Sequence, residues 1–98
     1  MSLATVLLSP EALNDLDEIW IFIAENDVAA ADRNEQTLRS AITLLAGRPG
    51  IGHLRQDLTD QPVRFWPVDD YLIIYGYSGR RLEVVRVLHG ARDVTRLF

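Results

Sequence analysis

Within eleven positions, the C-terminal stretch "RVLHGARDVTRLF" holds three arginines and a histidine: Arg86, His89, Arg92 and Arg96. Guanidinium groups around an imidazole suit two kinds of chemistry. They can bind a phosphate or carboxylate of a partner. They can also support RNA cleavage without a metal, which requires a base for the 2′-hydroxyl, an acid for the leaving oxygen and cations on the phosphate. Further residues that could contribute to such a site are His53, Arg55 and Arg64.

Structural explanations exist for the same side chains. By strand alternation, Arg86 shares an apolar row with Leu82, Val84 and Leu88, and a buried guanidinium in that row requires an acceptor. The candidate acceptors are Asp57, Asp60, Asp69 and Asp70. His89 at a strand end is equally consistent with a hydrogen-bonded structural histidine.

Other chemistries find little support in the sequence. The two histidines, His53 and His89, lie in different predicted elements and the chain has no cysteine, so no metal site is predicted. Ser9, Ser40 and Ser78 fall at a cap, in a helix and in a turn, and no glycine-rich phosphate loop follows a strand. We therefore expect no cofactor and no covalent nucleophile.

Composition and charge narrow the class of protein. Ninety-eight residues, 48% of them hydrophobic, predict a single domain spanning residues 1–98. Residues 1–49 carry eight acids and three arginines, a net charge of −5, whereas residues 50–98 carry six acids and seven arginines, a net charge of +1. The overall net charge of −4 argues against direct sequence-specific nucleic-acid binding. The absence of a leader, a membrane span and cysteine predicts a cytoplasmic protein.

The first half of the chain predicts a strand and two helices. Residues 3–8 form an apolar strand, and Ser9 with Pro10 is a helix start. A helix over residues 10–25 follows, whose acidic residues Glu11, Asp15 and Glu18 are expected on its outer face together with an exposed Phe22. A second helix begins at Asn26 or Asp27 and continues through Ala46. Its apolar face consists of Ala31, Leu38, Ile42 and Leu45.

The second half predicts a loop over residues 47–62 and then strands over residues 63–68, 71–77 and 81–89, joined by short turns. Pro67 places the first of these strands near an edge. The fold class is α+β: an N-terminal strand, an antiparallel helical hairpin and a three-stranded antiparallel meander, with the helices on one sheet face. Both faces of the last two strands are apolar. Either the loop and the tail cover the second face, or a partner does.

Several stretches together resemble the ParE-type toxins of the RelE/ParE superfamily in bacterial toxin–antitoxin systems. They are "LSPEALNDLDEIWIFIAEN", "GRPGIGHLRQDL", "VRFWPVDDYLIIYGY" and, most specifically, "RVLHGARD" at residues 86–93. The resemblance covers residues 8–94. It implies a RelE/ParE-like α+β toxin that poisons DNA gyrase by binding and is neutralised by a cognate ParD-like antitoxin.

Residues of this chain are expected to have two roles: the resemblance implies a target patch, and the apolar side chains expected at the surface are the candidate antitoxin contacts. The gyrase-interaction patch would be Arg86, His89, Arg92, Arg96 and Arg64, with no catalytic residue. A disordered antitoxin segment that folds on binding would contact Phe22, Trp66 and Tyr77.

Two alternatives remain open at the sequence level. One is a RelE-type, ribosome-dependent mRNA endonuclease, and the other is an inactive family member that only binds antitoxin. The RNA-cleaving relatives tend to end in a tyrosine that takes part in catalysis and to carry lysines in the loop. This chain instead ends in Phe98 and has His53 and Arg55 in that loop. Both departures favour the gyrase inhibitor.

Overall fold

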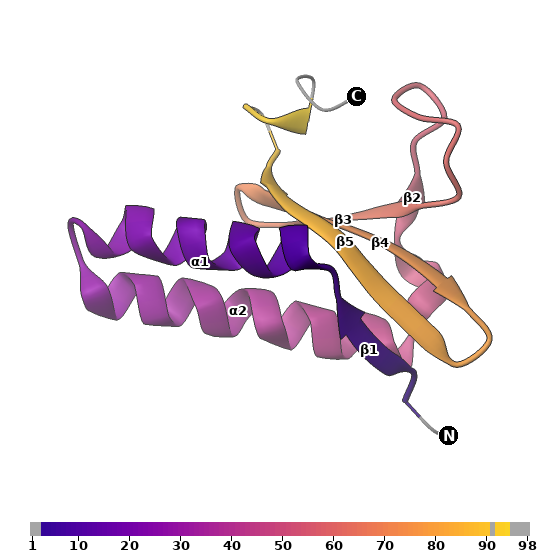
Figure 1. Ribbon diagram of the computed structural model, residues 1–98, viewed down its shortest axis with the longest axis horizontal. Coiled ribbons are helices and arrows are strands. Elements are labelled where there is room, and N and C mark those ends of the chain that lie inside the picture. The colour runs from indigo at the N-terminus through magenta and orange to yellow at the C-terminus, as the bar shows by residue number, and fades with distance from the viewer. Residues whose placement is uncertain (1–2, 91, 95–98) are drawn as a thin grey trace.

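Two antiparallel helices pack on one face of a five-stranded mixed sheet with the strand order β1-β5-β4-β3-β2 (Figure 1). The computed structural model describes residues 3–90 and 92–94. In chain order the elements are β1 (Thr5–Leu8), α1 (Pro10–Ala24), α2 (Val28–Gly47), a 3-10 turn η1 (Pro49–Ile51), β2 (His53–Leu54), β3 (Arg64–Val68), β4 (Tyr71–Ser78) and β5 (Arg81–His89). The predicted α+β class is confirmed. Within the described ranges, neither helix is long and apolar enough to cross a membrane.

Ser9 begins α1 and also joins it to the sheet. Its hydroxyl oxygen accepts a hydrogen bond from the Ala12 N–H at 2.9 Å and donates one to the Val85 carbonyl at 2.7 Å. Pro10 occupies the first turn, as predicted, where a missing N–H costs little. One short polar side chain therefore fixes the start of the helix against the middle of β5.

The second helix follows the sequence pattern closely. Asp27 is the N-cap, and its carboxylate accepts a hydrogen bond from the Ala30 N–H at 3.1 Å. The predicted apolar face is buried along its length, at Ala31, Leu38, Ile42 and Leu45. The two helices are further joined near the tip of the hairpin, where the Trp20 indole N–H donates to Asp32 at 2.9 Å.

Besides the predicted meander of β3, β4 and β5, the sheet contains the predicted N-terminal strand, β1, and one strand that was not predicted, β2. β1 lies at one edge and pairs with β5 in parallel. The predicted loop over residues 47–62 contains β2, which pairs with β3 at Phe65 and Arg64. A strand of two residues is too short to show alternation, so this loop prediction is wrong at β2. The residues of β3 that pair with β2 are Arg64 and Phe65, and Pro67 lies beyond them. This agrees with the prediction that the strand containing Pro67 lies near an edge.

A β-bulge in β5 changes which side chains share a face. Tyr75 pairs with Val84 but Ile74 pairs with Arg86, which leaves Val85 as an extra residue. Val84 and Val87 therefore both belong to the core beneath the helices, whereas Leu88 belongs to the core on the opposite face. The predicted row of Arg86 with Leu82, Val84 and Leu88 is wrong, because simple alternation does not continue through a bulge.

The second face of the sheet is covered by the chain itself. Leu58 and Val63 from the segment before β3, and Val94 after β5, pack with the buried side chains of Phe65 and Leu88. Of the two alternatives, cover by the loop and the tail is confirmed. A partner is not needed to bury this face.

Tyr75 holds the segment around η1 and β2 against the sheet. Its hydroxyl accepts a hydrogen bond from the Gly52 N–H at 2.9 Å and donates one to the Pro49 carbonyl at 2.6 Å. Burial is the main cause that raises the pKa of Tyr75 above its ordinary value. A Cβ on Gly52 would overlap the Tyr75 ring, so glycine alone permits this close approach.

We expect Tyr75→Phe to lower the free energy of unfolding by about 1–3 kcal/mol, because it leaves the Gly52 N–H and the Pro49 carbonyl without their buried partner. The matched control is Tyr77→Phe on the same strand, where the side chain is exposed. That change should cost less than about 0.5 kcal/mol. Urea denaturation of both variants checks the difference, and equal stabilities would contradict the anchoring role of Tyr75.

Candidate functional site

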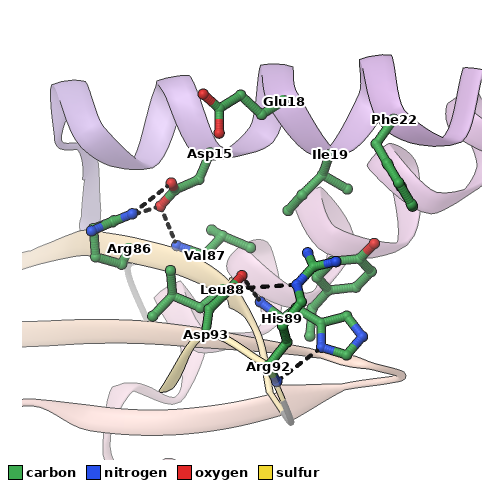
Figure 2. A pocket seen from close by; sticks show the side chains of 11 residues that line it. Asp15, Glu18, Ile19, Phe22, Arg86, Val87, Leu88, His89, Arg92 and Asp93 are labelled. Carbon is green, nitrogen blue, oxygen red and sulfur yellow. Dashed lines mark hydrogen bonds and ion pairs between the residues drawn. The ribbon is translucent and has the colours of Figure 1, made fainter. Parts of the chain in front are cut away.

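An open pocket of about 590 Å³ lies where the second half of α1 faces the end of β5 (Figure 2). Its walls come from α1, from the start of β4, and from β5 with the turn that follows it. The lining residues are Asp15, Glu18, Ile19, Phe22, Tyr71, Arg86, Val87, Leu88, His89, Arg92 and Asp93. Three of the four cationic residues that opened the sequence analysis therefore meet at one place.

Asp15 is a buried carboxylate at one end of this pocket. It accepts hydrogen bonds from Arg86 Nε at 2.7 Å, from Arg86 Nη2 at 2.9 Å and from the Val87 backbone N–H at 2.9 Å. Its side chain is only 7% exposed. The prediction that Asp15 lies on the outer face of α1 is wrong, and so are the four loop aspartates proposed as acceptors for Arg86.

A spacing in the sequence could have revealed this position. Ala12, Asp15, Leu16 and Ile19 follow the i, i+3, i+4, i+7 pattern of one helix face. Ala12 and Leu16 are fully buried, so the carboxylate between them points into the protein. An acid within such a stripe predicts a buried partner.

Arg86 consequently has a structural role. The hydrogen bond that Arg86 donates to Asp15 is the main cause that raises the pKa of Arg86, so the guanidinium stays charged at any physiological pH. Its side chain is 27% exposed, and its two bonds to Asp15 form a bidentate pair of fixed geometry. Arg86 joins β5 to α1 rather than presenting its charge fully to a partner.

His89 organises the turn after β5. Its backbone N–H donates to Asp93 at 3.3 Å, and its ring Nδ1 accepts from the Arg92 N–H at 3.3 Å. The ring meets Tyr71 edge to face, with centroids 5.7 Å apart. Burial raises the pKa of Tyr71 despite the nearby positive charge of Arg92. These contacts fix the backbone from which Arg92 projects.

Arg92 is the most accessible cation of the pocket among the described residues. Its side chain is 60% exposed, and its Nε donates to Asp93 at 3.3 Å. Phe22, 60% exposed, points toward the same space from α1 (Figure 2). The pocket thus combines an aromatic wall with a guanidinium held on an ordered turn.

The other predicted site residues lie elsewhere. Arg64 donates to the Gly52 carbonyl at 2.9 Å and lies 5.7 Å from the centre of the Tyr77 ring. Tyr77 is six residues along β4 from Tyr71, about 20 Å at the rise of a strand. Trp66 stacks on His53. Arg96 and Phe98 lie outside the described residues. The predicted patch therefore divides, with Arg86, His89 and Arg92 together and Arg64 apart.

Comparison with known proteins identifies relatives of the whole described fold. A family model described as "ParE toxin of type II toxin-antitoxin system, parDE" matches residues 6–94. A chain from the solved structure "Chromosomal ParDE TA system from P. aeruginosa" has a TM-score of 0.71 and 16% sequence identity, over 89% of this chain and 96% of that chain. At that identity, the structural match establishes a shared fold. A search of curated proteins gives no significant match.

We expect Asp15→Ala to lower the free energy of unfolding by about 3–5 kcal/mol, because it leaves the Arg86 guanidinium and the Val87 N–H without their acceptor. Asp17→Ala is the control, since it removes the same charge from an exposed position of the same helix. Urea denaturation measures the stability of both. A similar loss in the two variants would show that charge rather than the buried contact matters.

Proposed function

The chain belongs to the ParE toxin family of type II toxin–antitoxin systems, and from this membership we propose that it arrests growth by binding DNA gyrase. The proposed contact is the cationic turn formed by His89 and Arg92. A cognate ParD-like antitoxin neutralises the toxin by binding it. The protein inhibits through this contact and performs no chemical step of its own.

The observation that carries the proposal is the ordered presentation of Arg92. The turn that holds it is closed by His89 Nδ1 and the Asp93 carboxylate, while the guanidinium projects with 60% of the side chain exposed. A planar guanidinium on a fixed backbone can bind a carboxylate or phosphate of a protein–DNA target in two-point fashion. Because the backbone of the turn is already ordered, little backbone freedom is lost when such a contact forms, which favours affinity.

The same geometry disfavours RNA cleavage. His89 Nδ1 is engaged by the Arg92 N–H and Arg86 is bound to Asp15, so both groups serve structural contacts. His53 lies on β2, with β3 and β4 between it and β5. At the spacing of neighbouring strands this is about 14 Å. Arg55 forms an ion pair with Asp57. Of the residues considered for the nuclease alternative, Arg86, His89 and Arg92 therefore share one pocket, whereas His53 and Arg55 lie apart from it, so the two histidines do not form an acid–base pair.

Antitoxin binding involves surface that the folded chain leaves exposed. Because the second sheet face is covered internally, the proposed contacts lie at the exposed aromatic residues instead. Phe22 is 60% and Tyr77 is 42% exposed. Trp66, partly buried against the core beneath the helices, is the third proposed contact. A segment that reached all three would extend over much of the molecule, as disordered segments that fold on binding can.

The proposal is tested by two assays on one preparation of toxin. We expect inhibition of gyrase supercoiling, with trapped cleavage complexes, and no transcript cleavage on translating ribosomes. Transcript cleavage with unaffected gyrase would instead establish the nuclease, and the absence of both activities would establish an antitoxin-binding module without toxicity.

The contribution of the turn is tested by substitution. Arg92→Ala should weaken gyrase inhibition about tenfold or more, equivalent to at least about 1.4 kcal/mol, if the guanidinium is a principal contact. Arg39→Ala is the matched control, because it removes an equally exposed arginine from α2. Both variants are compared at equal folded fraction. Full inhibition by folded Arg92→Ala protein would remove the turn from the mechanism.

A further inference from the structure

The outer edge of β1 carries backbone groups that point away from the rest of the sheet (Figure 1). The Thr5 N–H donates to a carbonyl of the β4–β5 turn at 2.6 Å, and the Ser9 N–H donates to a carbonyl of β5 at 3.0 Å. Because successive residues of a strand direct their N–H and carbonyl groups to opposite sides, those of Val6 and Leu8 point outward. Among the described residues, no strand pairs with this side of β1.

We propose that this edge pairs with the same edge of a second copy, so that the free protein forms a symmetric dimer in which two five-stranded sheets join into one. The two β1 strands run antiparallel about a two-fold axis beside Leu7. Val6 of each copy exchanges backbone hydrogen bonds with Leu8 of the other, and the two Leu7 side chains lie opposite each other. The inference concerns the free protein and does not depend on the proposed function.

The free groups of the edge are arranged symmetrically about Leu7, which favours a second copy as the occupant. Before them, the Ala4 N–H already donates to the Ala46 carbonyl at 2.9 Å. After them, Pro10 has no N–H and begins α1. A long foreign strand would therefore find few backbone partners here. The same short edge turned about a two-fold axis matches each outward donor with an acceptor.

The side chains of this edge suit self-pairing as well. Residues 3–8 include no charge and no proline, which are the usual means of protecting an edge strand. Leu3 is 61% exposed, and Val6 and Leu7 are each 36% exposed. Like charges that faced each other across a two-fold axis would repel, whereas apolar side chains gain burial there. The acids that give each copy its net charge of −4 lie outside this segment.

The helices leave this edge open. Val6 pairs with Leu82, which is buried in the core beneath the helices, so Val6 points to the helix side and Leu7 to the opposite face. Helix α1 packs mainly over β5 rather than over β1. β1 pairs with the first four residues of β5, through Val84, whereas the pocket lies at the last residues of that strand. The dimer contact and the pocket are therefore separate surfaces.

The size of the contact predicts a weak dimer. A stable interface buries about 800 Å² on each partner, which is more than a strand of four residues offers. We expect sedimentation equilibrium of the purified protein to show a shift from monomer to dimer between about 1 µM and 1 mM. A protein that stays monomeric throughout this range, and whose β1 amides gain protection from hydrogen exchange only when antitoxin is added, would assign the edge to that partner and overturn the inference.

Substitution at the two-fold axis tests the symmetry. Leu7→Glu sets two carboxylates opposite each other and should weaken dimerisation about tenfold or more. Leu54→Glu is the control, because it changes a 51% exposed leucine on β2, at the other edge of the sheet. It should leave the dimer within about twofold. A mixture of Leu7→Glu and Leu7→Lys proteins should associate more tightly than Leu7→Glu alone.

Dimerisation that survives Leu7→Glu, that is lost in Leu54→Glu, or that the mixture does not restore would each overturn the proposed axis. Melting temperatures confirm that the variants are folded at the temperature of the measurement.

A single cysteine tests the register directly, because the chain has none of its own. Residues that face each other in a non-hydrogen-bonded antiparallel pair have Cα atoms about 4.5 Å apart, which is within the range of a disulfide. With oxidised glutathione as the oxidant, Leu7→Cys should therefore form a covalent dimer. Val6→Cys, whose side chain lies on the other face and opposite Leu8, should do so at least about tenfold more slowly. Equal rates for the two variants would contradict the register.

Discussion

Asp15 places a carboxylate with almost no solvent access between a helix and a strand, and it accepts three N–H groups there, two from Arg86 and one from the Val87 backbone. The backbone bond matters as much as the ion pair, because it ties the main chain of β5 to α1 at the residue that begins the floor of the pocket. Buried charges are tolerated only when their hydrogen bonds are satisfied in this way. The position of α1 over the sheet and the shape of the pocket both follow from this contact.

The β-bulge at Val85 lies immediately before these contacts and makes them possible. By inserting one residue, it changes the phase of β5 so that Val84 and Val87 both belong to the core beneath the helices. Val85 itself packs with the second core and accepts the Ser9 hydroxyl through its carbonyl. Ser9 and Asp15 are less than two helical turns apart. They therefore form hydrogen bonds with the β5 backbone at the bulge residue Val85 and just after it at Val87. Bulges commonly redirect side chains next to functional sites, and here the redirected segment leads to His89.

The sequence predicted the regular parts of this fold well and the irregular parts poorly, for a common reason. Helices α1 and α2 and strands β3 to β5 are long enough to show periodicity, and the helix caps at Ser9 and Asp27 use side-chain types that are typical of that position. If the pairing that begins with Ser78 and Arg81 at the β4–β5 turn continued without a shift, Tyr71 would pair with Leu88. The bulge moves it opposite His89. Periodicity cannot reveal such a one-residue shift, because the shift depends on contacts between elements distant in the chain. The burial of Asp15, by contrast, could have been inferred from its place between Ala12 and Leu16 on the buried face of α1.

The uneven charge of the chain can be understood from the same contacts. Asp15, an acid of the strongly negative first half, is used internally to satisfy Arg86 from the second half. Within the described residues, the exposed positive charge at the end of β5 is thereby reduced to Arg92, itself beside Asp93. One exposed arginine in the pocket provides too little charge for the phosphate-dominated, salt-sensitive binding typical of general nucleic-acid binders. It suits the recognition of one or two acidic groups at a defined position. An acidic protein can therefore carry a local cationic site, since the Asp15–Arg86 pair leaves Arg92 as the most exposed arginine of the pocket.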